Sequence, residues 1–168
     1  MSRFPSPAPH SLGAPLLAFA KANRWFLLGL GALYIVTRLP FIPLGYGANP
    51  DSWGAARAAR ILAEKGVYEV GRYPGYVLHE LISAPLVQIG GWLATNAASA
   101  FVYLFALVAV VYIAQVNQHR SPRMLLVLFT IFPLFWLSSV ETLDYAWYLA
   151  ADLVAYALLL SGRATTSA

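Results

Sequence analysis

Long apolar stretches separated by short polar segments dominate the sequence. A membrane-spanning helix needs about 20 mostly apolar residues, and four stretches of the chain approach that length. They run from Trp25 to about Leu44, from about Asn96 to Val116, from about Met124 to Ser138, and from about Leu143 to Leu160. The pattern therefore predicts an all-α membrane protein with about four transmembrane helices.

A further apolar segment, Tyr76 to Leu93, is interrupted by polar and helix-breaking residues. His79, Glu80, Pro85 and a Gly-Gly pair lie inside it. Such a segment is more typical of an interfacial or re-entrant helix than of a full span. If it were a span, the Arg120–Arg123 loop would lie outside, against the preference of basic residues for the cytoplasm.

The composition agrees with a membrane location. Of the 168 residues, 60% are hydrophobic and 11% are charged, whereas soluble domains have about 25% charged residues. The chain contains no cysteine, so it has no disulfide framework and no thiolate metal site. The formal net charge is +4. Because no dense cluster of basic residues with interleaved aromatic residues is present, nucleic-acid binding is not expected.

The basic residues predict the orientation of the spans, because short cytoplasmic segments collect Lys and Arg. They precede the first span, separate the second from the third and follow the fourth: Arg3, Lys21, Arg24, Arg120, Arg123 and Arg163. The chain is therefore expected to be a multi-pass protein of the plasma (inner) membrane with a cytoplasmic N-terminus. A long first extracytoplasmic loop, about residues 45–95, and the short segment with Glu141 and Asp144 then lie on the outer side.

The two ends of the chain are interpreted separately from the membrane module. Residues 1–24, rich in Pro and Ser as far as Pro15, are interpreted as a disordered cytoplasmic tail. Residues 25–161 are expected to form the transmembrane module. Residues 162–168 are interpreted as a short tail and a truncation point.

The outer loop is predicted to begin with a turn and an amphipathic helix. Gly45–Pro50 is rich in turn residues, and Asp51 and Ser52 follow it at positions typical of helix caps. The helix is predicted from about Trp53 to Lys65, with Gly66 as its end. One face carries charge and suits a membrane surface; it consists of Arg57, Arg60 and Glu64.

Two interpretations of Asp51 are possible from the residues alone. Asp51 is either a helix cap or a carboxylate at the mouth of a membrane cavity that deprotonates an acceptor hydroxyl as a general base. Arg72, together with Arg57 and Arg60, could bind a phosphate through charge-assisted hydrogen bonds. The alternative for these arginines is contact with lipid head groups.

A second acidic group lies at the start of the fourth span. If a helix begins near Glu141, the 3.6-residue period places Glu141, Asp144, Tyr145, Tyr148 and Asp152 on one stripe. A carboxylate at the depth of Asp152 is costly in hydrocarbon. We therefore expect it to face a protein or water-filled interior, in a functional or a structural polar role.

The adjacent pair His79-Glu80 is a weak signal for a metal site. No second cluster of histidines accompanies it, and metal sites generally need several such ligands. A surface or hydrogen-bonded role is expected for both residues. No cofactor is predicted, and a divalent metal stays open.

Four motifs, in this order, resemble the integral-membrane glycosyltransferases of the GT-C type, which include protein O-mannosyltransferases and the aminoarabinose transferase of lipid A. The resemblance extends from about residue 38 to residue 160. The motifs are Asn49-Pro50-Asp51-Ser52-Trp53, Gly66-Val67-Tyr68, Arg72-Tyr73-Pro74-Gly75-Tyr76 and Glu141-Thr142-Leu143-Asp144-Tyr145.

The resemblance implies transfer of a sugar from a polyprenyl-phosphate donor on the outer face of the membrane. It implies an essential aspartate in the first loop, which corresponds to Asp51, and a second acidic group, which corresponds to Asp144 or Glu141. The candidate substrate-binding residues are Arg72, Arg57, Arg60, Tyr76 and Trp53. Such enzymes have more spans than this chain, so a missing C-terminal half or a partner subunit is an expected partner, besides membrane lipids.

A function of another class is also compatible with the sequence. The chain could be a non-catalytic membrane subunit or a small transporter component. The outer loop would then be a docking surface, and Asp152 would be a polar anchor between helices.

Overall fold

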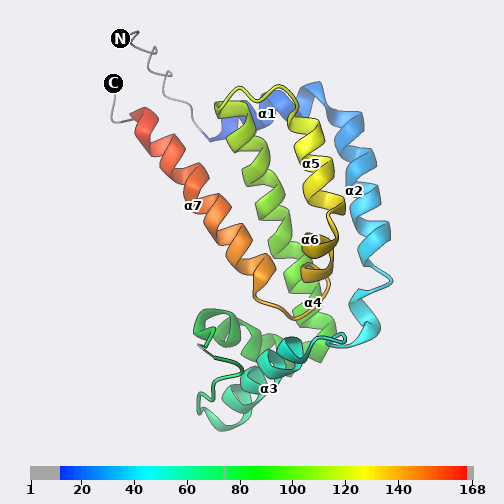
Figure 1. Ribbon diagram of the computed structural model, residues 1–168, viewed down its shortest axis with the longest axis vertical. Coiled ribbons are helices and arrows are strands. Elements are labelled where there is room, and N and C mark those ends of the chain that lie inside the picture. Colours follow the sequence, from blue (N-terminus) through cyan, green and yellow to red (C-terminus); the bar gives the residue numbers. More distant parts are fainter. Residues whose placement is uncertain (1–11, 74, 166–168) are drawn as a thin grey trace.

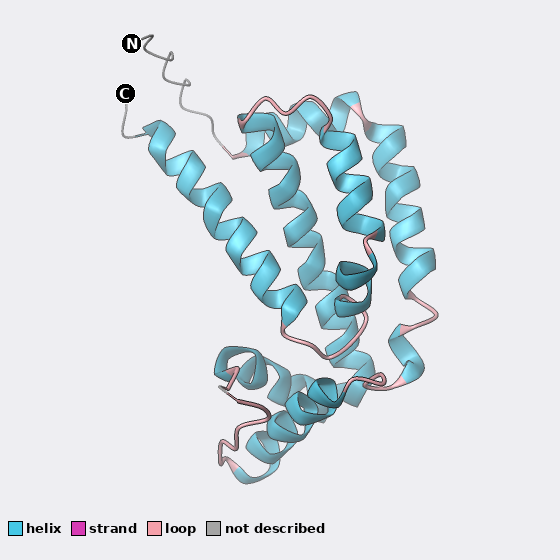
Figure 2. Cartoon of the chain, in the orientation of Figure 1, coloured by secondary structure: helices cyan, strands magenta, loops and turns pink. Residues whose placement is uncertain are grey.

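The computed structural model describes residues 12–73 and 75–165, and the regular elements in these ranges are helices without strands (Figures 1 and 2). In chain order they are α1 (Gly13–Ala22), α2 (Arg24–Arg38), the 3-10 helix η1 (Ile42–Leu44), α3 (Pro50–Lys65), α4 (Val77–Val116), α5 (Pro122–Ile131), α6 (Pro133–Ser138) and α7 (Tyr145–Thr165). The all-helical fold class is therefore confirmed for the described residues.

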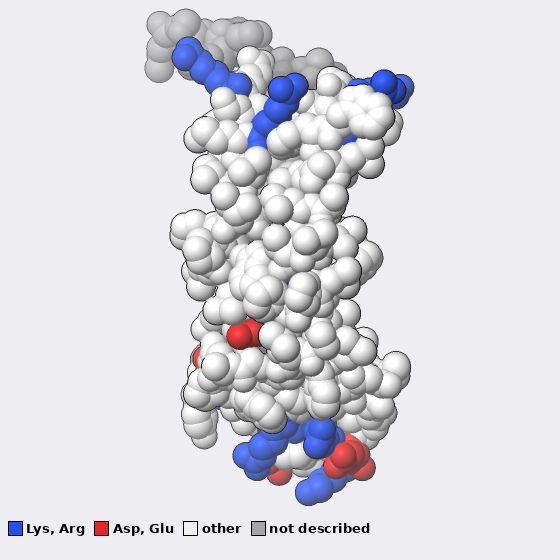
Figure 3. Space-filling view, turned by 90° about the vertical axis from the view of Figure 1, so that its right-hand side faces the viewer, with Lys and Arg blue, Asp and Glu red and all other residues white. Residues whose placement is uncertain are grey.

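Three helical segments in the described part of the chain are long and apolar enough to cross a membrane: Arg24–Leu44, Val77–Val116 and Tyr145–Gly162. Figure 1 shows α2, α4, α5 and α7 along the long axis of the molecule, with α3 across one end. On the face drawn in Figure 3, Lys and Arg gather at the two ends and the middle is almost free of charge. This distribution suits a helical membrane protein.

The predicted third span, Met124 to Ser138, is not one continuous helix. It is divided between α5 and α6 by Phe132, whose backbone is extended with ψ of 123°. A residue that precedes a proline disfavours the helical conformation, and Pro133 follows here. Because each piece is shorter than a span, the total of four spans stays a prediction.

The predicted interfacial helix and the predicted second span lie in one 40-residue element, α4. Its backbone is non-helical at Gly90 and at Gly91, where φ is +55°. Glycine adopts this left-handed conformation without the steric penalty that a Cβ atom causes. The two glycines therefore join an earlier helical segment, which packs on α3 through Ala84 and Val87 against Ala59, to a later one inside the bundle.

Helix α1 corrects the prediction of a disordered segment over residues 1–24. Leu16 and Phe19 of α1 pack against the bundle core, and Phe19 is buried. Burial of these apolar side chains stabilises the helix despite the Pro and Ser content around it. Residues 1–11 lie outside the described part of the chain. At the other end, α7 continues to Thr165, so residues 162–165 are helical and do not form the predicted tail; residues 166–168 are not described.

The core of the bundle lies where α4 meets α5 and α7. Small side chains at Ala106, Ala146 and Ala150 let these helices approach closely, and Tyr103 fills the space beside them. The Tyr103 hydroxyl donates to the carbonyl oxygen of Phe129 in α5 at 2.6 Å. This packing fixes the start of α7, and therefore Asp144 and Tyr145, relative to α4.

Both described sets of basic residues that fix the predicted orientation lie at the same end of the bundle. Lys21 and Arg24 flank the junction of α1 and α2, and Arg120 and Arg123 precede or begin α5 (Figure 1). Arg123 donates to the Asn23 side chain and joins the two junctions. Helix α3 lies at the opposite end. Which end faces the cytoplasm stays a prediction.

Candidate functional site

The N-terminus of α3 places Asp51 beside the helical bundle. Asn49, rather than Asp51 or Ser52, caps the helix: its side-chain oxygen accepts a hydrogen bond from the Asp51 backbone N–H at 3.0 Å. Pro50 occupies the first helical position, where its missing N–H is not needed. The predicted cap role of Asp51 is therefore wrong. Its carboxylate lies in the first turn, where the helix dipole favours negative charge.

Arg72 connects Asp51 to Asp144 across three segments of the chain. Its guanidinium donates to the Asp51 carboxylate, to Asp144 Oδ1 at 2.6 Å and to the Tyr145 hydroxyl at 3.1 Å. It also lies over the ring of Tyr76, 4.1 Å from the ring centroid. We call Asp51, Arg72, Tyr76, Asp144 and Tyr145 the Arg72 cluster. It brings together residues of three of the four sequence motifs.

The two carboxylates of the Arg72 cluster differ in exposure. The Asp51 side chain is 39% exposed and the Asp144 side chain is 5% exposed. Asp144 Oδ2 is buried and has no hydrogen-bond partner within the described residues. Burial raises the pKa of Asp144, and the charge of Arg72 opposes that rise. Burial would lower the pKa of Arg72, but its hydrogen bonds to Tyr145 and Asp51 and the charge of Asp144 raise it.

The segment between α3 and α4 is held in place by Glu80. This carboxylate is 1% exposed, accepts from the Tyr68 hydroxyl at 2.5 Å and accepts from the Gly71 backbone N–H at 3.1 Å. The hydrogen bond to Glu80, with a smaller effect of burial, raises the pKa of Tyr68 to about 12. Since Gly71 precedes Arg72, Glu80 fixes the point from which the Arg72 side chain extends.

The same segment approaches α3 at a backbone contact that only glycines allow. A Cβ atom added to Gly54 would lie 2.7 Å from the carbonyl oxygen of Gly71, and one added to Gly71 would lie 2.4 Å from Glu80 Oε1. Contacts this short are repulsive, so a larger residue at either position would displace the backbone. Glycine at both positions therefore keeps Arg72 within reach of Asp51.

Glu141 lies near the Arg72 cluster but is not bonded to Arg72. It is 8% exposed, and the hydroxyl of Ser52 donates to Oε2 at 3.5 Å. A Cβ atom added to Gly47 would lie 2.4 Å from Glu141 Oε1, so the turn before α3 packs directly on this carboxylate. Burial raises the pKa of Glu141, and the Ser52 hydrogen bond opposes that rise.

The other predicted substrate-binding residues do not join the Arg72 cluster. Arg57 forms an exposed salt bridge to Glu69 at 3.3 Å, and Arg60 is exposed on the same helix. Trp53 is 56% exposed and donates its ring N–H to the carbonyl oxygen of Gly47 at 3.0 Å. These side chains lie on the outer surface of α3.

The position of Asp152 differs from the predicted one. Asp152 was expected to face a protein or water-filled interior, but it is exposed on α7. Tyr145, Tyr148 and Tyr156 are exposed as well and share its face by the helical period. Because α7 begins at Tyr145, Glu141 precedes the helix and is not part of this stripe.

No group of three or more His, Cys, Asp or Glu side chains within residues 12–73 and 75–165 could hold a metal ion. Glu80 is already bonded to Tyr68 and Gly71. His79 is buried, and its ring packs edge-on against Trp147 with 5.5 Å between centroids. The hydroxyl of Ser83 lies 3.5 Å from His79 Nε2. Of the two roles expected for this pair, surface or hydrogen-bonded, the structure therefore shows the hydrogen-bonded one in a buried position.

Arg38 was not among the candidate functional residues predicted from the sequence. Arg38 is 1% exposed and lies over the ring of Tyr34, 3.8 Å from the ring centroid. An arginine inside an apolar span, four residues after a tyrosine, was the signal available in the sequence. Charged residues in such positions face the protein interior or a ligand.

No family model matches the sequence, and neither a curated protein nor a solved structure matches it. A functional interpretation of the Arg72 cluster therefore depends on its geometry, which joins the start of α3 to the start of α7 through Arg72.

Proposed function

We propose that this chain takes part in glycosyl transfer on the extracytoplasmic face of the membrane, as a component of a GT-C-type glycosyltransferase. The donor would be a sugar linked to polyprenyl phosphate. The observation that carries the proposal is the contact of Arg72 with both Asp51 and Asp144 at the polar end of an apolar bundle. A lipid-linked donor needs such a place, where a polar reaction centre lies beside membrane-spanning helices.

Exposure distinguishes the roles of the carboxylates. Asp51 is accessible to an acceptor from solvent, so it serves as the general base. Asp144 is buried and bonded to Arg72, and Glu141 is buried against the turn that carries Gly47. These two carboxylates therefore act as positioning residues, which hold Arg72 and the turn before α3.

Arg72 neutralises the phosphate of the donor in this mechanism. The acceptor oxygen attacks the anomeric carbon and forms the new glycosidic bond while the bond from that carbon to the phosphate oxygen breaks. The acceptor proton goes to Asp51, and the phosphate leaves with the electron pair of the broken bond. Arg72 stabilises the charge that develops on the leaving phosphate. Since Arg72 is bonded to Asp51 in this structure, phosphate binding and release of the Asp51 carboxylate are coupled.

The test uses proteoliposomes that contain the full chain and a panel of radiolabelled polyprenyl-phosphate sugars. Release of polyprenyl phosphate and labelling of acceptors are measured by chromatography. We expect turnover of at least one donor and a loss of about 100-fold or more in Asp51→Asn, which removes the base. Turnover of Asp51→Asn at the parent rate would exclude Asp51 as the base. Absence of turnover with every donor would contradict glycosyl transfer by this chain alone.

Arg57→Gln is the matched control for Arg72→Gln in this assay. Both substitutions remove one arginine from the same end of the molecule, but Arg57 forms only the exposed pair with Glu69. We expect Arg57→Gln to retain turnover and Arg72→Gln to lose it. Equal losses in the two variants would indicate an effect of surface charge and not of the Arg72 cluster.

The exposed stripe on α7 favours a second function, that of a non-catalytic membrane subunit. A carboxylate on the lipid-facing side of a spanning helix is unfavourable, and Asp152 becomes acceptable when another helix covers it. In that case Asp152→Leu should reduce the size of the native complex on blue native gels of membranes. A complex of unchanged size would contradict this role.

A further inference from the structure

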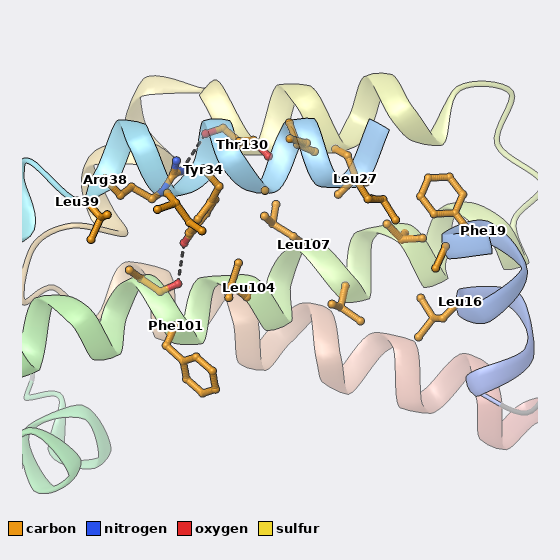
Figure 4. A pocket seen from close by; sticks show the side chains of 18 of the residues that line it. Leu16, Phe19, Leu27, Tyr34, Arg38, Leu39, Phe101, Leu104, Leu107 and Thr130 are labelled. Atoms are coloured by element: carbon orange, nitrogen blue, oxygen red, sulfur yellow. Dashed lines mark hydrogen bonds between the residues drawn. The ribbon is translucent and has the colours of Figure 1, made fainter. Parts of the chain in front are cut away.

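An apolar cavity of about 660 Å³ lies between α2 and the later part of α4, with α1 at one end and α5 along its side (Figure 4). Aliphatic and aromatic side chains make up most of its lining. Exposed members of the lining open the cavity to the outside of the bundle: Ile35, Leu39, Phe101, Leu104 and Val108. In a membrane-embedded bundle this opening faces lipid. We call this cavity the α2–α4 groove.

Arg38 lies at one end of the α2–α4 groove, near the C-terminus of α2, and Phe19 lies at the other end (Figure 4). The guanidinium donates to Ser139 Oγ at 2.9 Å, to the Thr130 carbonyl oxygen at 2.8 Å and to Thr37 Oγ1 at 3.1 Å. These partners are neutral. Arg38 is the only charged residue that lines the groove in the part of the chain that the structure describes.

Two polar groups at this end of the groove could bind an anion. Arg38 carries a positive charge, and its hydrogen-bond partners Ser139, Thr130 and Thr37 are neutral. The hydroxyl of Thr130 is buried, lines the groove and has no partner among the described residues. A buried guanidinium without a counter-charge is unfavourable, and an anion beside Arg38 and Thr130 would remove that penalty.

We propose that the α2–α4 groove binds an acidic phospholipid of the surrounding bilayer. The phosphate accepts hydrogen bonds from Arg38 and Thr130, and one acyl chain lies along the apolar lining toward Phe19. One cation in the groove matches a head group with one negative charge. Because the groove opens to the bilayer, abundant membrane phospholipid fills it by mass action. The proposal concerns the groove alone and does not depend on glycosyl transfer at the Arg72 cluster.

The experiment is native mass spectrometry of the full chain in a nonionic detergent. Phosphatidylglycerol or phosphatidylcholine with identical acyl chains is added at equal concentration. We expect one retained phosphatidylglycerol per chain and a preference of about tenfold over phosphatidylcholine, in keeping with hydrogen bonds from a charged donor. Arg38→Gln should remove the preference, and Arg38→Lys should restore part of it because it keeps the charge. Equal binding of the two lipids to the parent chain would overturn the proposal.

A pair of glycine variants keeps the test decisive if Arg38→Gln fails to fold. Gly31 lines the groove and Gly29 does not, and both lie on α2 with open space around an added Cβ atom. Gly31→Leu should reduce phosphatidylglycerol binding, and Gly29→Leu should not. Equal binding in these two variants would overturn the proposal. A stable dimer that retains no lipid, or displacement of phosphatidylglycerol by an equal concentration of polyprenyl monophosphate, would also overturn it.

Discussion

Arg38, which is buried, and Arg72, which is partly buried, lie in opposite electrostatic environments. Arg72 and Arg38 each lie over a tyrosine ring, 4.1 Å and 3.8 Å from its centroid. Arg72 is also bonded to two carboxylates from distant parts of the chain. The partners of Arg38 are hydroxyl and carbonyl oxygens, without a carboxylate among the described residues. The charge of Arg72 is thus balanced by carboxylates of the fold, whereas Arg38 has no counter-charge among the described residues.

This difference determines what each protein variant leaves behind when the charge is removed. Removing Arg72 would leave Asp144 buried without a counter-charge, which is strongly destabilising. Removing Arg38 would remove a buried charge and would leave unbonded only its neutral hydrogen-bond partners. The stability of variants should therefore distinguish the two arginines, even though both are shielded from solvent.

The largest effect is expected for Arg72→Gln. The loss of a counter-charge for Asp144 should lower the free energy of unfolding by about 3 kcal/mol. Thermal unfolding in detergent, followed by tryptophan fluorescence, measures it. Arg57→Gln, which breaks an exposed pair, should change the free energy by less than about 1 kcal/mol. Equal stability of the two variants would show that Arg72 does not hold the fold together.

Gly54→Ala tests whether the Arg72 cluster depends on the backbone contact between α3 and the following segment. The added methyl group would meet the carbonyl oxygen of Gly71, so the segment must move. This displacement should lower the free energy of unfolding by about 2 kcal/mol. Gly29→Ala on α2 is the control, because open space surrounds it. Hydrogen exchange should increase around Arg72 in Gly54→Ala alone. Unchanged exchange there would contradict the close approach.

Arg38→Gln should destabilise less than Arg72→Gln. It removes hydrogen bonds to Ser139 and Thr130 but leaves no buried anion. The free energy of unfolding should therefore fall by about 1 to 1.5 kcal/mol in lipid-free detergent. The same thermal measurement applies. A loss greater than that of Arg72→Gln would reverse the comparison and indicate that Arg38 is mainly structural.

The smallest effect is expected for Glu141→Gln and depends on pH. Burial raises the pKa of Glu141 above its ordinary value of 4.5, so the folded state binds this proton more tightly than the unfolded state. The stability that tighter proton binding provides is present below the ordinary pKa of Glu141 and is lost as pH rises through the folded-state pKa. Glu141→Gln should therefore raise Tm by about 2 °C at pH 8 and have little effect at pH 4. An equal shift at both pH values would exclude titration of Glu141 as the cause.

The sequence was informative where a single residue type determines the local backbone. Gly66, predicted to end the amphipathic helix, has φ of +67° and accepts the left-handed conformation at its C-terminus. The break at Pro133 was visible in the same way, because the preceding residue avoids helical backbone. It was missed because the apolar content of Met124 to Ser138 dominated the interpretation.

The candidate site was predictable only in part. The motifs selected Asp51, Arg72 and Asp144, but their bonding depends on tertiary packing, which brings together residues separated by 21 and 72 positions. The outward position of Asp152 had no local signal, since its helical face is known only once the start of α7 and the packing of the bundle are known. Arg38 had such a signal, but its neutral partners come from α5 and the segment after α6.

The order of residues in the Arg72 cluster has a consequence for biosynthesis. A ribosome makes Asp51 and Arg72 well before Asp144, so the pair they form can exist while the chain is still growing. The contact with Asp144 can form only after α4, α5 and α6 have been synthesised and the start of α7 has followed them. The nascent protein therefore carries a half-paired guanidinium until the start of the last described helix has been made.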